Sequence, residues 1–525
     1  MFAAGAQSGV SPPPLGVTQA QLNAHSIGAD WPTYNGDYTG RRYSSLTQIT
    51  PQNVADLRAQ WVFHSNNAGT LEATPVVVSG VMYVTASNDA YALNATDGQV
   101  LWHYSRPVTA GLIDDASGHI SRGVALWGHR LYMETDNAHL LCLDARSGHL
   151  IWDVAYASWN RNYGATSAPL ALHGKIIVGT SGGDDGVRGF IAALDAKTGA
   201  LVWRRWTIPA PGEFGSSSWP GDLYLHGGGT AWMPGTYDPE LDTLYWGTGN
   251  AAPDYDGSVR PGDDLYTASL LALDPDTGRL KWYFQFTPHD VYDYDGVQTP
   301  VLVDGQYRGL QRKLVVEANR NGFIYVLDRT NGHFLAATRF APRVNWASGI
   351  DASGRPIFTH LQPSPGGTLT CPGEAGATNW FSPTWNPKTG LFYFMALDAC
   401  TVNFVKPEKF AEGKEFYATG ARQEPHGSRR KVLMAFNPFT GAFAWKYPQQ
   451  GDGHSWGGVM STASGLVFFA DDSGSFEAVK GRTGEPLWHF PTGQTIHASP
   501  MSYSVDGRQY VAIASGDDLF SFALP

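Results

Sequence analysis

The chain has 525 residues, of which 42% are apolar, 13% aromatic and only 16% charged, so it can bury a large core and is neither disordered nor a coiled coil. Its 36 basic and 47 acidic residues give a net charge of −11, which argues against nucleic acid as a partner, and no apolar run approaches the ~20 residues that span a bilayer. Gly and Pro, at 61 and 33 residues, are enriched as in proteins built from many short strands joined by turns.

The first segment, MFAAGAQSGVSPPPLG, lacks a basic region followed by a long apolar stretch, so it does not read as a secretory signal. We predict that residues 1–30 form an N-terminal extension.

From there on, one pattern recurs along the chain. A strand ends, in most copies at Asp or Asn, a Thr-Gly-type turn follows, and the next strand carries a Trp four residues after the Gly. Degraded copies surround Gly332 and Gly390, and RAQWVF around Trp61 could represent the first unit. The clear copies end at Trp102, Trp152, Trp203, Trp282, Trp445 and Trp488.

Each copy predicts a β-hairpin, because Asp caps the turn and Gly supplies positive φ. Another alternating pair precedes each copy, as in SAPLALHGKIIVGT before the third, so each repeat is about four antiparallel strands. Such sheets bury both faces when they pack radially, and closure into a ring removes exposed edges. The sequence therefore predicts an all-β propeller of seven to eight blades, with the repeated tryptophans packed between neighbouring blades.

Three polar clusters do not belong to the repeat: SGGDDGVRG from Ser181, YWGTGNAAPDYDG from Tyr245 and TPHDVYDYDG from Thr287. Each lies at a strand end or in a loop, so they could converge near the ring axis. Their carboxylate and amide oxygens suit Ca²⁺ or a larger trivalent cation, although each Asp taken singly is more typical of a turn cap. The candidate ligands are Asp184, Asn250, Asp293 and Asp295; Asp185, Asp254 and Asp256 are further acids of the same loops.

The ordered motifs GVRGFIAALD, GTYDPELDTLYWGTGN, PGDDLYTASLLALDPDTG, FQFTPHDVYDYDG and ANRNGFIYVLDR resemble those of the pyrroloquinoline-quinone (PQQ)-dependent alcohol dehydrogenases, which include methanol dehydrogenase. The likeness runs from about Trp31 to the last residue. It implies an eight-bladed β-propeller, with residues 31–525 as a single domain and the quinone across the axis. It also implies oxidation of an alcohol to an aldehyde or ketone by hydride transfer to metal-bound PQQ.

The resemblance assigns roles position by position. Asp293 matches the catalytic base, and Arg320 could stabilise charge on the quinone carbonyl oxygen. Asp184 occupies the place of a metal-binding Glu, with Asn250 as the amide ligand, and Trp232 corresponds to the indole that stacks under the cofactor. The cofactor-binding positions are Glu72, Arg122, Thr166, Ser181, Gly182, Gly183, Thr230, Arg320 and Asn379, with Trp456 as a looser match.

This chain departs from the family at three places. Ala116 and Ser117 stand where many members carry two adjacent cysteines over the cofactor, so that face must be covered otherwise. Asp184 is one methylene shorter than Glu, and Asp185 could substitute for it. Asp295 marks lanthanide-dependent members, and strand alternation would turn it to the same side as Asp293, so we favour a lanthanide ion, with Ca²⁺ as the alternative.

The resemblance also implies a disulfide between Cys371 and Cys400, which supports a periplasmic location. Cys142 lies in a repeat strand and reads as a small buried hydrophobe. No C-x-x-C-H segment exists to attach haem, so we expect an external electron acceptor such as cytochrome c.

Two other functions stay open. One is a non-catalytic propeller scaffold that binds protein partners, which would need neither the acidic cluster nor a stacking Trp. The other is a calcium-dependent sugar or polyol dehydrogenase of related fold. The insertion FAPRVNWASGIDASGRPIFTHLQPSPGGTLT and the missing cysteines predict a pocket not sized for methanol. The sequence carries no signal for the oligomeric state.

Overall fold

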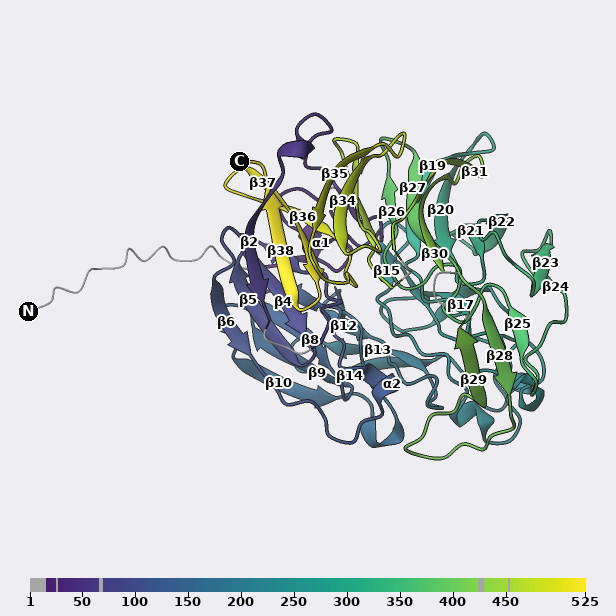
Figure 1. Cartoon of the computed structure of the whole chain (residues 1–525). Coiled ribbons are helices and arrows are strands. Elements are labelled where there is room, and N and C mark those ends of the chain that lie inside the picture. Colours follow the sequence, from purple (N-terminus) through teal and green to yellow (C-terminus); the bar gives the residue numbers. More distant parts are fainter. Residues whose placement is uncertain (1–15, 25–26, 66–68, 424–428, 452–453) are drawn as a thin grey trace, which may run out of the picture.

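The computed structural model describes residues 16–24, 27–65, 69–423, 429–451 and 454–525, so residues 1–15 and 25–26 of the predicted extension lie outside it. The described chain is almost entirely β-structure (Figure 1). The α-helices within it are α1 (Gln19–Leu22) and α2 (Asp114–Ser117), and the 3₁₀ turns are Val54–Asp56, Trp159–Arg161, Ser216–Ser218, Leu223–Leu225 and Gly257–Val259. Within the same residues, no helix is long and apolar enough to cross a membrane.

Four-stranded antiparallel sheets follow one another along the first two thirds of the chain, as the repeat predicted. They are β3–β6 (Val76–Val78, Val81–Ala86, Asp89–Asn94, Val100–Tyr104), β7–β10 (Val124–Trp127, Arg130–Thr135, His139–Asp144, Leu150–Ala155), β11–β14 (Leu170–Leu172, Lys175–Val178, Phe190–Asp195, Leu201–Trp206), β15–β18 (Thr236–Asp238, Thr243–Gly247, Ser269–Leu273, Leu280–Gln285) and β19–β22 (Val301–Tyr307, Leu310–Ala318, Phe323–Asp328, His333–Arg339).

The C-terminal part adds sheets of the same kind. They are β26, β27, β30 and β31 (Thr384–Asn386, Leu391–Asp398, Arg430–Asn437, Ala442–Pro448), β32–β35 (Val459–Thr462, Leu466–Ala470, Ser475–Lys480, Pro486–Pro491) with the parallel strand β1 (Tyr43–Ser44) at its edge, and β36–β38 (Met501–Val505, Arg508–Ser515, Asp518–Ala523) with β2 (Arg58–His64).

The hairpin of β13 and β14 shows how the repeat folds. The carboxylate of Asp195 accepts hydrogen bonds from the main-chain N–H of Lys197 and Thr198, at 3.0 and 2.8 Å. Gly199 then adopts a φ of +74°, which an L side chain rarely tolerates. The local sequence therefore dictates this turn, as predicted.

The repeated tryptophans pack between consecutive sheets. The Cα of Gly148 lies so close to the indole of Trp102 that an added Cβ would come within 2.6 Å of it. Trp102 Nε1 also donates to the carbonyl of Ala145 in the same neighbouring sheet, at 3.0 Å. The same indole-on-glycine contact joins Trp61 to Gly98, Trp152 to Gly199, Trp203 to Gly278, Trp282 to Gly332 and Trp445 to Gly484. These tryptophans are structural, as predicted.

The last sheet contains the strand that holds Trp61. β2 pairs antiparallel with β38, from the Arg58 and Ala523 partners to those of His64 and Asp518, and the two strands lie side by side in Figure 1. RAQWVF is therefore the outer strand of a sheet whose other strands lie at the end of the described chain.

One repeat was misassigned from the sequence. The turn at Gly390 joins β26 to β27, whereas the turn at Gly441 joins β30 to β31 of the same sheet. NPKTGLFY is thus the first hairpin of that sheet and not a separate degraded copy, because Asn-x-x-Thr-Gly turns serve any hairpin and do not mark one position in the repeat.

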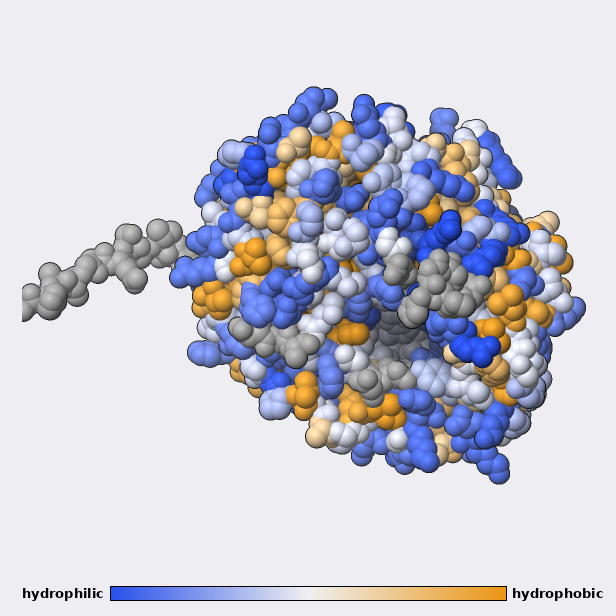
Figure 2. Space-filling view, viewed as in Figure 1, coloured by the Kyte–Doolittle hydropathy of each residue, from blue (hydrophilic) through white to orange (hydrophobic). Residues whose placement is uncertain are grey.

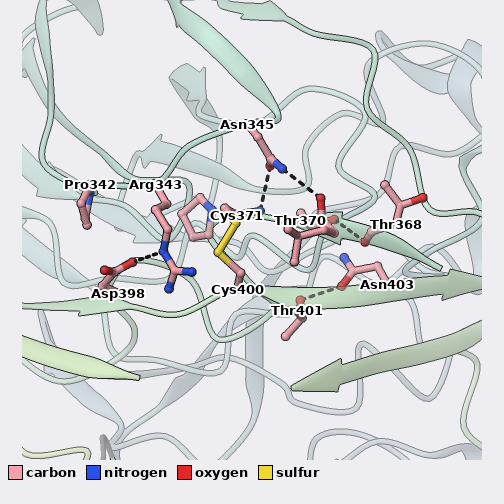
Figure 3. The surroundings of a disulfide bond; sticks show 12 residues. Pro342, Arg343, Asn345, Thr368, Thr370, Cys371, Asp398, Cys400, Thr401 and Asn403 are labelled. Atoms are coloured by element: carbon pink, nitrogen blue, oxygen red, sulfur yellow. Dashed lines mark hydrogen bonds and ion pairs between the residues drawn. A yellow bond between two sulfur atoms is a disulfide. The ribbon is translucent and has the colours of Figure 1, made fainter. Parts of the chain in front are cut away.

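A long insertion follows β22 and contains small sheets of its own, the strands of which are β23 and β24 (Ala347–Ile350, Pro356–Phe358) and β25, β28 and β29 (Thr368–Thr370, Thr401–Val405, Thr419–Gln423). The expected disulfide between Cys371 and Cys400 is present (Figure 3). Next to it, Asn345 accepts a hydrogen bond from the main chain of Cys371 at 2.8 Å. Cys142 is buried and free, and burial raises the pKa of its thiol to about 11, as expected of a structural cysteine.

Candidate functional site

Three loops bring the polar clusters together. Residues 181–189 connect β12 to β13, residues 248–257 follow β16, and residues 287–296 connect β18 to β19. The main-chain N–H of Gly296 donates to the carbonyl of Thr248 at 2.9 Å and so ties the third loop to the second. Figure 2 shows this face of the molecule hollowed, in the region between α2 and β29 of Figure 1.

Arg320 lies at the centre of the acidic cluster. Its Nη1 donates to Oδ1 of Asp293 at 2.8 Å, and its Nη2 lies 3.2 Å from Oδ2 of Asp295. The main-chain N–H of Asn250 donates to Oδ1 of Asp295 at 2.7 Å, and its side-chain amide donates to Oδ1 of Asp184 at 2.9 Å. The structure therefore gathers all four predicted metal ligands around one arginine.

Asp293 and Asp295 face the same side, as predicted, since both contact Arg320, but strand alternation is not the reason. These residues lie in a loop, and Asp293 has a φ of +67°. The carboxylate of Asp290 holds this loop, because it accepts hydrogen bonds from the N–H groups of Tyr292 and Tyr294 at 3.1 and 2.8 Å. The two acids share one side because this turn places them there.

Burial and neighbouring charges set the electrostatics of the cluster. Burial raises the pKa of Asp293 well above its usual range; the charge of Arg320 opposes this rise, while Asp295 and Asp184 add to it. Burial alone would lower the pKa of Arg320, but the carboxylates of Asp295 and Asp293 outweigh it and raise that pKa. Excess negative charge therefore gathers here around a single cation, as in sites that receive a further positive ion.

A cavity of about 280 Å³ opens over this cluster. Its walls include the indole of Trp232, above which the guanidinium carbon of Arg122 lies 5.1 Å from the ring centroid. Glu72 holds Arg122 through an ion pair of 2.6 Å. The predicted site residues that line this cavity are Arg122, Thr166, Ser181, Gly182, Gly183, Asp184, Thr230, Trp232, Asn250, Asp293, Asp295 and Arg320, while Asn379 and Trp456 line an adjoining cavity.

The segment that replaces the two cysteines lies at the wall of the cavity. Ser117, together with Gly118 and Ile120, lines the cavity, and the hydroxyl of Ser181 donates to the carbonyl of Ala116. The segment that stands in place of the two cysteines therefore forms part of the cavity wall.

The residues present fit both a flat anionic quinone and a hard cation. Trp232 offers an aromatic platform, and Arg122 with the hydroxyls of Thr166 and Thr230 offers donors at the rim. Thr230 packs directly on Gly183, because an added Cβ there would lie only 2.8 Å from Thr230 Oγ1. The carboxylates beside this cavity are oxygen ligands of the type that Ca²⁺ and larger trivalent ions bind.

The other acids of these loops differ in their surroundings. Asp184 lines the cavity and Asp185 does not, so the structure favours Asp184 as the ligand. Asp256 caps its turn through the N–H of Ser258 at 3.0 Å, in line with the structural reading. Asp254 is no turn cap, because it is 1% exposed and neither carboxylate oxygen has a hydrogen-bond partner among the described residues.

Sequence reasoning missed several residues of this region. Asp290 stood in a quoted motif, and its Asp-x-x-Asp neighbourhood could have indicated a loop anchor. Glu374 and Tyr417 gave no signal, because the insertion brings them to the cavities from far along the chain.

Comparison with known proteins agrees with this site. Residues 31–346 and 423–511 match the family described as PQQ, glucose/ethanol/alcohol dehydrogenase, β-propeller domain. The chain is 38% identical to quinohemoprotein alcohol dehydrogenase ADH IIB of Pseudomonas putida, over 95% of this chain and 75% of that protein.

Solved structures point the same way. Quinohemoprotein alcohol dehydrogenase from Comamonas testosteroni superposes with a TM-score of 0.90 and 34% identity, covering 97% of this chain and 82% of that one. A europium-containing methanol dehydrogenase superposes with a TM-score of 0.89 and 29% identity, covering 96% of this chain and 100% of that one. The chain therefore belongs to the PQQ-dependent quinoprotein alcohol dehydrogenases, and it is an oxidoreductase that acts on alcohol groups.

Proposed function

We propose that the protein oxidises an alcohol to an aldehyde or ketone with PQQ and a metal ion held in the cavity of Trp232. The observation that carries this proposal is the Asp293–Arg320–Asp295 cluster beside that indole-floored cavity. A propeller that served only as a protein scaffold would have no need to bury these charges.

When bound, PQQ supplies a two-electron oxidant that accepts hydride, and the ion supplies a Lewis acid. Trp232 would provide the aromatic face for the flat cofactor, and Arg122, positioned by Glu72, would pair with one of its carboxylates. Asp293 accepts the proton of the substrate hydroxyl at its carboxylate. Arg320, which donates to Asp293 at 2.8 Å, orients that carboxylate and would stabilise negative charge that develops on the cofactor.

The ion would be held by Asp184, Asn250, Asp293 and Asp295, and we favour a lanthanide over Ca²⁺. The second acid of the Asp293–Asp295 turn adds a negative charge to the ligand set, and this favours a trivalent over a divalent ion. Similarity to the europium-containing methanol dehydrogenase supports this choice.

The sheets are proposed to close into a ring of eight blades. The indole contacts between consecutive sheets and the pairing of β2 with β38 support an eight-bladed propeller formed by residues 31–525 as one domain. The Cys371–Cys400 disulfide supports a periplasmic location. Electrons would leave one at a time to an external acceptor such as cytochrome c.

The test is reconstitution of the apo-protein with PQQ and either Ca²⁺ or a light lanthanide, followed by a dye-linked assay on a panel of alcohols. Turnover with the lanthanide, and its loss by about 100-fold or more in Asp293→Asn with quinone absorbance retained, is the expected result. Turnover with Ca²⁺ alone would overturn the lanthanide assignment. No quinone absorbance with either ion would overturn the enzymatic function in favour of the scaffold.

A further inference from the structure

A second cavity, of about 470 Å³, adjoins the cofactor cavity, and we call it the outer cavity. The two share Asp184, Asp293 and Arg320, so the outer cavity opens directly onto the proposed base. Its other polar lining residues include Tyr255, Glu374, Glu415, Tyr417, Gln423 and Arg429. Among the described residues that line it, none has a large aliphatic side chain.

Glu374 is fixed at the wall of the outer cavity. Its carboxylate accepts hydrogen bonds from Tyr255 Oη at 3.3 Å and from the side-chain amide of Gln423. Its main-chain N–H donates to Thr401 Oγ1 at 3.2 Å, and its carbonyl accepts from Arg320 Nη1 at 3.4 Å. The carboxylate is thus held next to Arg320, which positions Asp293. Its oxygens can still accept further hydrogen bonds from a ligand.

An unsubstituted alkyl chain fits this cavity poorly. It would strip water from Glu374 and Arg429 and return no hydrogen bond, and uncompensated desolvation of charged groups is costly. A chain of hydroxyl groups replaces that water, because each O–H donates to a carboxylate and each oxygen accepts from an amide or guanidinium. The ring of Trp456 adds an aromatic face for the C–H groups of such a molecule.

We propose that the substrate is a polyhydroxylated alcohol, a polyol or sugar, whose spare hydroxyls bind Glu374 and its neighbours in the outer cavity. This inference rests on the proposed alcohol oxidation and adds the substrate class. One hydroxyl is oxidised beside Asp293, and the remaining hydroxyls are recognised by the outer cavity.

The experiment compares alcohols of equal carbon number on the reconstituted enzyme: erythritol with butan-1-ol, and D-glucose with hexan-1-ol. At least one polyhydroxylated compound should exceed its alkanol by about tenfold or more in kcat/KM, the factor expected of hydrogen bonds to charged groups. Preference for both alkanols would overturn the substrate class while leaving alcohol oxidation standing. Inactivity on all four, without quinone absorbance, would overturn both.

Glu374→Gln tests the residue. It should raise KM for the preferred polyhydroxylated compound about tenfold more than KM for its alkanol, since only the polyhydroxylated compound has spare hydroxyls to donate to the carboxylate. Glu412→Gln, at an exposed residue that does not line the outer cavity, is the matched control. An equal loss on both substrates would assign Glu374 a merely structural role. Quenching of tryptophan fluorescence by the polyhydroxylated compound, weakened in Glu374→Gln, gives a readout independent of turnover.

Discussion

The proposed chemistry of this protein depends on a few acidic side chains beside the cavity. Asp293 and Asp295 are useful because one arginine and one loop hold them together, and each would be costly alone. Their identity followed from the resemblance, whereas their common orientation did not follow from period-two alternation, because the turn at Asp293 is irregular. Residue type was therefore predictable, and loop geometry was not.

Asp295 is expected to set the choice of ion. Asp295→Asn keeps the acceptor oxygen for the Asn250 N–H but removes one negative charge. Terbium affinity, measured by luminescence titration, should fall by at least about tenfold, and calcium affinity should fall less. Asp276→Asn, in an exposed ion pair with Lys175, serves as the control. An equal loss for both ions would contradict this role.

Glu134, which is not one of the proposed metal ligands, should make the free energy of unfolding depend on pH. Burial raises its pKa from 4.5 to about 8, against the hydrogen bonds from Tyr156 and Ser167. The native state therefore keeps a proton that the unfolded chain releases, so this residue makes stability fall as pH rises from about 4.5 to about 8. The loss is on the order of 4 kcal/mol.

The measurement is urea unfolding of the wild type and Glu134→Gln between pH 5 and 8. The variant should lose less stability over that range, because its amide does not titrate. Parallel curves for the two proteins would show that Glu134 is charged in the native state.

At the scale of elements, the insertion between β22 and β26 completes the site. The span between Cys371 and Cys400 contains Glu374 and Asn379, both of which contact Arg320. Sequence analysis could predict the cysteine pair from the resemblance, but not that the enclosed segment reaches the base. That placement depends on long-range packing, which no local pattern encodes.

Replacing both cysteines by serine should lower the free energy of unfolding by roughly 3–4 kcal/mol, the loop-closure value for a separation of 29 residues. PQQ affinity should also fall, because Asn379 and Glu374 lose their constraint. Reductant is the control: it should destabilise the wild type and leave the double variant unchanged. Unchanged unfolding in the double variant would show that packing alone holds this segment.

At the scale of the whole molecule, sheets are joined by indoles that rest on glycines. The Asp-Thr-Gly-Trp spacing predicted these contacts well, because each repeat carries both a Trp and the turn Gly on which the Trp of the preceding sheet rests. The repeat count was less secure, because a common turn such as the one at Gly390 recurs outside its expected position.

Alanine substitutions at two glycines of the same sheet distinguish the cost of backbone strain from the cost of a clash with the neighbouring sheet. Gly174 and Gly199 both have positive φ, at +71° and +74°, but a Cβ meets nothing within 4 Å at Gly174 and lies 2.7 Å from Val154 Cγ2 at Gly199. Gly174→Ala should cost about 1 kcal/mol, and Gly199→Ala should cost a further 1–3 kcal/mol or so. An equal loss of unfolding free energy in the two variants would mean that the neighbouring sheet shifts to accommodate the added methyl group.

The pairing of β2 with β38 has a consequence for proteolysis. A cut in a loop between two sheets would leave each new end held in its own sheet. The two fragments would also stay joined to each other, because β2 of the first pairs with β38 of the second. A nicked molecule should therefore migrate as an intact particle and come apart only in denaturant, and its catalytic centre would keep its shape after the backbone has been severed.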